Sequence, residues 1–141
     1  MKTLFTNAQI IDGTGETFRG FLAIDGNEIS KVGPGAPDDT PSGFEVVDLA
    51  GACLLPGFFD CHVHLSLPGT KGSPIMAAMV PQSYRYFEIL DRLTATIGAG
   101  VTTVRDLMGV DVGVRDAVAH GIIEGPRLLV ADKMFSQTGG H

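Results

Sequence analysis

The feature that most constrains this chain is an apolar segment, residues 54–65, that ends in two histidines one residue apart, His62 and His64. Its composition predicts a β-strand, and successive side chains of a strand point to opposite faces. Asp60 and both histidines are therefore expected on one polar face. The other face is expected to be apolar and to pack against helices, and it carries Phe59, Cys61 and Val63. This pattern is typical of an inner barrel strand that directs imidazoles into the lumen at its carboxyl end.

The two histidines are candidate metal ligands, because a neutral imidazole is the commonest side-chain ligand for zinc and related ions. The alternative is a pair of hydrogen-bonded core or surface histidines, since the His-x-His pattern alone is weak. Asp60 is expected either to orient an imidazole through a hydrogen bond or to be a paired core acid, and the sequence favours neither. By strand parity Cys61 faces away from the histidines, so a packed core residue is favoured over a ligand.

Short β-rich segments separated by turn residues fill the first third of the chain. Asp-Gly pairs between apolar segments indicate hairpins, because glycine accepts the positive φ of a tight turn. A polar segment with three prolines, residues 33–43, is predicted to be a surface loop. Strands are expected at residues 2–11, 20–24, 28–32, 44–49 and 52–55.

After His64 the pattern changes to alternating strands and helices. A loop over residues 66–81 is expected first, either functional or a plain connector. A helix over 83–97 follows, and its apolar stripe is Tyr86, Leu90, Leu93 and Ile97. Asp111 is expected to cap a second helix that ends near His120, which is expected to be solvated rather than a ligand. Strands are expected at 101–107 and 128–131. This order predicts right-handed parallel βαβ units and an α/β fold class.

The segment from Leu55 to His64 resembles the first-strand signature of the amidohydrolase superfamily, the metal-dependent hydrolases built on a TIM barrel. Residues 7–13 and 24–29 resemble the small β domain that precedes the barrel in these enzymes. Residues 100–106 and 125–129 resemble the second and third barrel strands. The closing sequence, residues 138–141, is similar to the imidazolonepropionase-like and Xaa-Pro dipeptidase-like branch.

The resemblance implies two domains with a boundary near residue 56. Residues 1–56 would form the amino-terminal part of a composite β-sandwich, and residues 57–141 the first three strands of a (β/α)8 barrel. A complete barrel needs about 250 residues, so the barrel is expected to be incomplete in this chain of 141 residues. We therefore interpret the chain as the amino-terminal part of a longer enzyme or as a truncated product.

The resemblance also implies a reaction, hydrolysis of an amide or peptide C–N bond by metal-activated water, and a cofactor of one or two divalent ions, with zinc preferred. A dipeptide or a cyclic amide is the expected substrate. The family's remaining ligands, a lysine and two histidines, and its proton-shuttle aspartate are expected beyond residue 141, so no catalytic residue is assigned. His141 is expected either to contact the substrate or to be a disordered terminal residue.

Charge and hydropathy exclude other classes of partner. The net charge is −6, and the ten basic residues are scattered, which argues against nucleic acid or an anionic membrane. No apolar segment reaches the roughly 18 residues of a membrane span, and no signal peptide is evident, so a cytoplasmic location is expected. Cys53 and Cys61 are expected to be free thiols. The sequence leaves open whether the chain forms a homo-oligomer.

Two other functions are kept as alternatives. The chain could be a non-catalytic fragment that binds metal weakly or needs a complementary chain to cover its open sheet edges. It could also be a self-contained β-sandwich module with an unrelated helical tail, in which case the histidine pair is incidental.

Overall fold

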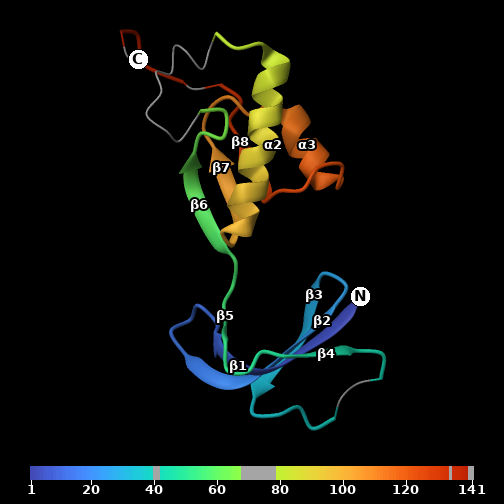
Figure 1. The fold of residues 1–141 in the computed structure, drawn as a ribbon. Helices are drawn as coiled ribbons and strands as arrows, with labels where there is room; N and C mark the ends of the chain where they lie inside the picture. Colours follow the sequence, from blue (N-terminus) through green and yellow to red (C-terminus); the bar gives the residue numbers. More distant parts are fainter. Residues whose placement is uncertain (40–41, 68–78, 134, 140–141) are drawn as a thin grey trace. The chain divides into compact units, whose positions relative to one another are not determined.

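The computed structural model describes residues 1–39, 42–67, 79–133 and 135–139, and it divides the chain into two compact units, Met1–Pro56 and Gly57–His141 (Figure 1). The first unit contains the strands β1 (Lys2–Ile11), β2 (Thr17–Asp25), β3 (Glu28–Pro34), β4 (Glu45–Asp48) and β5 (Cys53–Leu54). The second contains β6 (Phe58–Val63), α2 (Gln82–Gly98), β7 (Val101–Asp106), α3 (Val112–Ala119) and β8 (Arg127–Val130).

The first unit is built on one five-stranded sheet among the described residues. Its strand order is β3-β2-β1-β4, and the short strand β5 also pairs with β1. The β1–β2 and β2–β3 pairs are antiparallel hairpins, whereas β4 and β5 lie parallel to β1. Leu4, Phe21 and Ala23 form its buried cluster. Gly20 has to be glycine, because a Cβ there would collide with the carbonyl of Gly33 on the neighbouring strand.

The second unit is a three-stranded parallel sheet in the order β6-β7-β8, with two helices in its connections (Figure 1). Strands that run parallel need crossover connections, and here α2 connects β6 to β7 while α3 connects β7 to β8. The carboxyl ends of all three strands therefore meet at one edge of the sheet. This is the edge at which α/β barrels place their functional groups.

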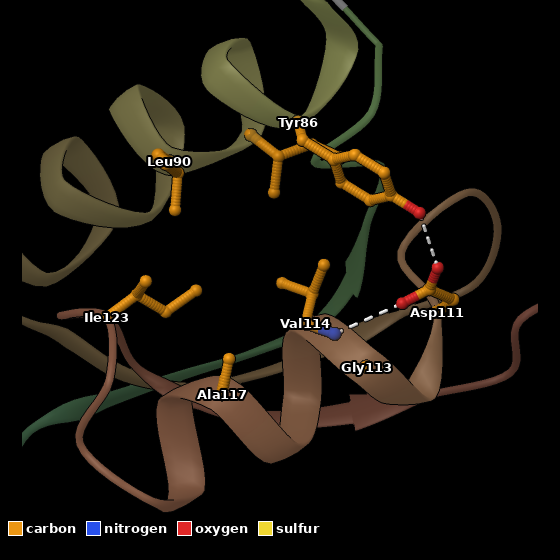
Figure 2. A pocket seen from close by; sticks show the side chains of 8 residues that line it. Tyr86, Leu90, Asp111, Gly113, Val114, Ala117 and Ile123 are labelled. Carbon is orange, nitrogen blue, oxygen red and sulfur yellow. Dashed lines mark hydrogen bonds between the residues drawn. The ribbon is translucent and has the colours of Figure 1, made fainter. Parts of the chain in front are cut away.

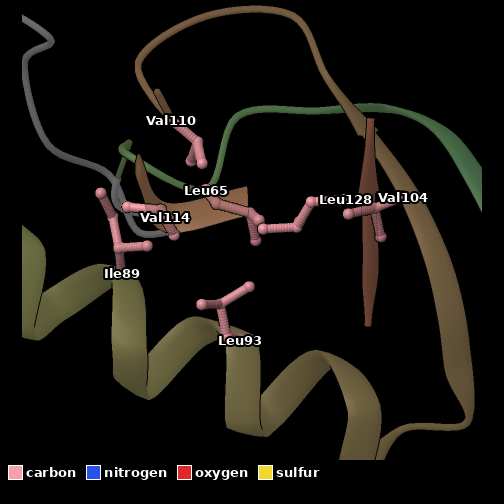
Figure 3. Close-up of a cluster of buried hydrophobic side chains, with 7 residues drawn as sticks. All are labelled: Leu65, Ile89, Leu93, Val104, Val110, Val114 and Leu128. Carbon is pink, nitrogen blue, oxygen red and sulfur yellow. The ribbon is translucent and has the colours of Figure 1, made fainter. Parts of the chain in front are cut away.

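The core of this unit joins both helices to one face of the sheet (Figure 3). Ile89 and Leu93 of α2 and Val114 of α3 are buried against Val104 of β7 and Leu128 of β8. Leu65, just after β6, belongs to the same cluster and is only 6% exposed. Its burial anchors the segment that follows the histidine pair.

The predicted elements agree with the structure to within a few residues, and the α/β class with a small β unit before a parallel strand-helix unit is confirmed. The predicted stripe of α2 contained Leu93 but omitted Ile89, which is 1% exposed. The predicted loop over residues 66–81 lies largely outside the described residues.

Asp111 links the two helices. Its Oδ1 accepts a hydrogen bond from the amide of Val114 at 3.1 Å, which confirms the predicted N-cap of α3. Its Oδ2 accepts a hydrogen bond from the hydroxyl of Tyr86 on α2 at 2.7 Å. The Tyr86 hydroxyl, followed by the amide of Val114, lowers the pKa of the Asp111 carboxyl below its ordinary value.

The loops after β6 and β7 touch through Gly109. This glycine has a φ of +97°, and a Cβ there would collide with the side chain of Ser66. Ser66 is itself buried, and its hydroxyl donates a hydrogen bond to the carbonyl of Met108 at 3.2 Å. Glycine at position 109 therefore allows the two loops to approach each other closely.

We expect Asp111→Ala to destabilise the second unit by about 1 kcal/mol, because it removes the helix cap and leaves the Tyr86 hydroxyl without its acceptor. Asp111→Asn keeps an N-cap acceptor and should cost less. Since the carboxyl has a lowered pKa in the folded state, its ionic contribution is present above its unfolded pKa and is lost as the pH falls through the folded value. The free-energy difference between the wild type and Asp111→Asn should therefore shrink below about pH 4.

The measurement is urea unfolding followed by tyrosine fluorescence. Both tyrosines lie in α2 and the chain has no tryptophan, so this signal reports on the second unit. A difference that stays constant between about pH 2 and about pH 6 would contradict the assigned role of the Asp111 charge.

Gly109→Ala is expected to destabilise the second unit by more than about 1 kcal/mol, because alanine disfavours the positive φ and its Cβ would displace Ser66. Gly98→Ala is the matched control: position 98 lies at the end of α2, with no atom within 4 Å of the added methyl and no positive φ. This control should be neutral or slightly stabilising. Equal urea midpoints for the two variants would refute the close approach of the loops.

Candidate functional site

The two histidines lie side by side at the carboxyl end of β6. Their ring centroids are 5.3 Å apart, and the ring planes meet at 78°. His62 is exposed and His64 is half-buried. The Nδ1 atom of His64 is buried and has no hydrogen-bond partner among the described residues. A buried ring nitrogen without a partner is costly unless a ligand or a metal ion satisfies it.

The regular alternation expected for β6 is interrupted. Asp60 pairs with Val104 and Val63 pairs with Asp106, so β6 advances three residues while β7 advances two. The register of β6 against β7 therefore shifts by one residue between Asp60 and Val63. Asp60 is exposed, and its Oδ1 accepts a hydrogen bond from the backbone amide of His62 at 3.0 Å. This carboxylate thus orders the backbone of the first histidine.

The structure also corrects the prediction for the opposite face of β6. Val63 packs against the core as expected. Phe59 is 72% exposed, and Cys61 is an exposed free thiol, so the expectation of a packed core cysteine is wrong. All residues from Phe58 to His62 are exposed and β6 is an edge strand, so neither face of this part of the strand is covered by the described residues. Cys53, in the first unit, is also a free and exposed thiol.

Asp106, the last residue of β7, is a fully buried charged group beside this strand end. It is 0% exposed, and its carboxylate accepts three backbone hydrogen bonds. The donors are the amides of Leu65 at 2.7 Å, Met108 at 3.0 Å and Val110 at 3.4 Å. Burial raises the pKa of the Asp106 carboxyl, while the three amides and the nearby His64 act in the opposite direction. From the sequence, Asp106 was expected near the end of a strand, with no assigned role.

β7 and the loop after it hold the residues that flank both histidines. The carbonyl of Cys61 accepts a hydrogen bond from Nε of Arg105 at 2.7 Å, and the carbonyl of Val63 accepts one from the amide of Leu107 at 3.1 Å. The amide of Leu65 is held by Asp106. Neither histidine ring takes part in these bonds, so both rings project from a backbone that is fixed on either side.

The other predicted site residues lie elsewhere. His120 is the C-cap residue of α3 and is exposed, as expected. His141 lies outside the described residues, so its expected contact with substrate stays a prediction. A pocket of about 290 Å³ opens between α2 and α3, and Tyr86, Leu90, Asp111 and Ile123 are among its lining residues (Figure 2). None of its lining residues is a predicted site residue.

The donor set of the histidine pair fits part of a metal site. Two adjacent imidazoles, one with a buried nitrogen that lacks a partner among the described residues, are suitable ligands for a divalent ion. In the described part of the chain, no group of three or more histidine, cysteine or acidic side chains could hold an ion. The described residues therefore contain two candidate ligands, fewer than the three protein ligands usual in catalytic zinc sites.

Comparison with known proteins finds relatives named imidazolonepropionase and dihydroorotase. The chain is 27% identical over 150 residues to an imidazolonepropionase of Hyphomonas neptunium, covering 82% of this chain and 37% of the relative. It is 45% identical over 69 residues to a dihydroorotase of Anaplasma phagocytophilum, covering 46% of this chain and 15% of the relative. The matches therefore cover between 15% and 37% of the length of these two relatives.

Solved structures agree with this result. A prolidase in complex with N-methylphosphonate-L-proline has a TM-score of 0.87 and 32% identity, and the match covers 100% of this chain and 34% of that one. A Xaa-Pro dipeptidase with bound methionine has a TM-score of 0.84 and 31% identity, with 100% and 36% covered. The family model described as "Amidohydrolase family" matches residues 53–140, which include the histidine pair and all three parallel strands. This chain belongs to the amidohydrolase family.

Proposed function

We propose that this chain forms the first part of a metal-dependent amidohydrolase that hydrolyses an amide or peptide C–N bond with water. In this proposal residues 1–56 are a part of the small β domain and residues 57–141 begin the barrel. The observation that carries the proposal is the adjacency of His62 and His64 at the end of β6, with ring centroids 5.3 Å apart, in a chain of this family.

The imidazoles of His62 and His64 would bind a divalent ion, for which zinc is the preferred candidate because it favours nitrogen ligands. Such an ion, when bound, makes water a nucleophile near neutral pH and polarises the scissile carbonyl. The chain's own residues set the geometry: Asp60 orders the His62 amide, and the buried surroundings of His64 Nδ1 keep water from competing for that nitrogen. The further ligands and the proton shuttle would come from residues other than those described.

The proposed substrates are small molecules. Proteins similar to this chain are named imidazolonepropionase, dihydroorotase and Xaa-Pro dipeptidase, so a cyclic amide and a dipeptide ending in proline are the two classes to test first. The similar prolidase was solved with a proline-containing phosphonate, which favours the dipeptide. His141 would then contact the substrate from the end of the segment after β8.

A non-catalytic fragment that needs a complementary chain is the alternative, and it rests on the exposed apolar surface of β6. Phe58 is 57% exposed and Phe59 is 72% exposed, and β6 and β8 each have one edge without a strand partner among the described residues. An unpaired strand edge is usually covered by another strand, helix or loop, because it exposes backbone hydrogen-bonding groups. Zinc binding without turnover of any tested substrate would support this alternative.

In the described part of the chain, no helix has the length and hydropathy needed to cross a bilayer.

The test is a double variant, His62→Ala/His64→Ala, assayed for zinc content and for hydrolysis of a Xaa-Pro dipeptide and of dihydroorotate. Removing both imidazoles should abolish zinc retention after dialysis and lower any turnover by at least about 100-fold. His120→Ala is the matched control, because it deletes an exposed histidine outside the candidate site. Unchanged zinc content in the double variant would refute the proposed site.

A further inference from the structure

Leu65, the residue after the histidine pair, has both of its backbone polar groups held by charged side chains. Its amide donates to Oδ2 of Asp106 at 2.7 Å, and its carbonyl accepts from a guanidinium nitrogen of Arg92 at 2.9 Å. Its own side chain is buried in the core of the second unit. Three independent contacts therefore hold one residue in place, from β7, from α2 and from the core.

These contacts bear directly on His64. The Leu65 amide belongs to the same peptide plane as the His64 carbonyl, so a bond to that amide restricts the backbone rotation next to the His64 ring. The ring has no hydrogen-bond partner at Nδ1 among the described residues that could orient it instead. The position of the imidazole thus depends on its backbone and its packing.

Both side chains that hold Leu65 are themselves held by polar contacts. The Asp106 carboxylate is fully buried and accepts hydrogen bonds from backbone amides. These hydrogen bonds compensate for the free-energy cost of removing the carboxylate from water, so breaking them is costly. Arg92 is ion-paired with Glu88 at 3.3 Å through one nitrogen, while the other nitrogen reaches Leu65. The ion pair orients the guanidinium without occupying the nitrogen that holds the Leu65 carbonyl.

We propose that Asp106 and Arg92 are positioning residues that fix the imidazole of His64 beside that of His62 by holding the two polar backbone groups of Leu65. The consequence for metal binding rests on the function proposed above. The consequence for the histidine geometry does not, because it holds in the metal-free protein.

The first test compares Asp106→Asn with Asp111→Asn. In Asp106→Asn the new side-chain NH2 group would face a backbone N–H, so one of the hydrogen bonds that hold this segment is lost while the side-chain volume is kept. We expect faster hydrogen exchange at the Leu65 amide, a weaker nuclear Overhauser effect between the two histidine rings, and zinc affinity lowered by about 10-fold or more in a chelator competition. Asp111→Asn makes the same chemical change in a carboxylate that does not touch Leu65. It should leave the Overhauser effect and the zinc affinity unchanged, and it should speed exchange at Leu65 no more than its lower stability accounts for.

The second test compares Arg92→Gln with Glu88→Gln. Both variants break the same ion pair, but only Arg92→Gln releases the Leu65 carbonyl. Zinc affinity should fall only in Arg92→Gln.

Comparing Asp106→Asn with Arg92→Gln separates positioning from simple electrostatics. Losing the negative charge of Asp106 weakens the attraction for a cation, whereas losing the positive charge of Arg92 strengthens that attraction. A loss of affinity in both Asp106→Asn and Arg92→Gln is expected from positioning alone. Arg92→Gln keeps the proposal testable if Asp106→Asn does not fold.

The proposal is overturned if the ring-to-ring Overhauser effect of the folded metal-free variants equals that of the wild type. It is also overturned if Arg92→Gln binds zinc as tightly as, or more tightly than, Glu88→Gln. A wild type whose zinc uptake does not shift the His62 and His64 resonances would instead refute the proposed function. The positioning role would then be decided by the metal-free measurements.

Discussion

The structure around the histidine pair depends on one buried carboxylate. The carboxylate of Asp106 accepts hydrogen bonds from backbone amides in the loops after β6 and β7. Its backbone carbonyl accepts a hydrogen bond from the amide of Ala131, after β8, at 3.0 Å. One residue therefore joins the carboxyl ends of all three parallel strands. Hydrogen bonds to an ionised group contribute about 1.5–3 kcal/mol each, which offsets part of the cost of burying the charge. Without these bonds the three loops would lack a common anchor.

Local patterns were sufficient to predict most of the fold. The spacing of Leu93 and its neighbours identified α2, and Asp111 identified the start of α3 because a capping side chain bonds only two or three residues ahead. The His-x-His pattern and the Pro-Gly before it identified the family that the comparison with known proteins confirms. Each of these signals lies within a few residues of the structure that it predicts.

The sequence could not reveal contacts between distant segments. Asp106 lies in phase with the buried Val104, and an acid on an apolar face is a sign of a special role, but its partner Leu65 is 41 residues away. The same limit explains the error for Cys61. Alternation along a strand predicts which residues share a face, but whether that face is covered depends on elements distant in the sequence, and the described residues leave Phe58 to His62 exposed.

The register shift between β6 and β7 has a consequence for transferring this segment into another protein. In a regular strand the carboxylate of Asp60 would point the same way as the imidazoles and would compete with them for protons or ions. In this chain β6 carries one additional residue against β7 before Val63, and Oδ1 of Asp60 accepts the backbone amide of His62. A graft of β6 alone would therefore copy the sequence of the motif but not the arrangement of its side chains, because the positions of the imidazoles depend on both β6 and β7.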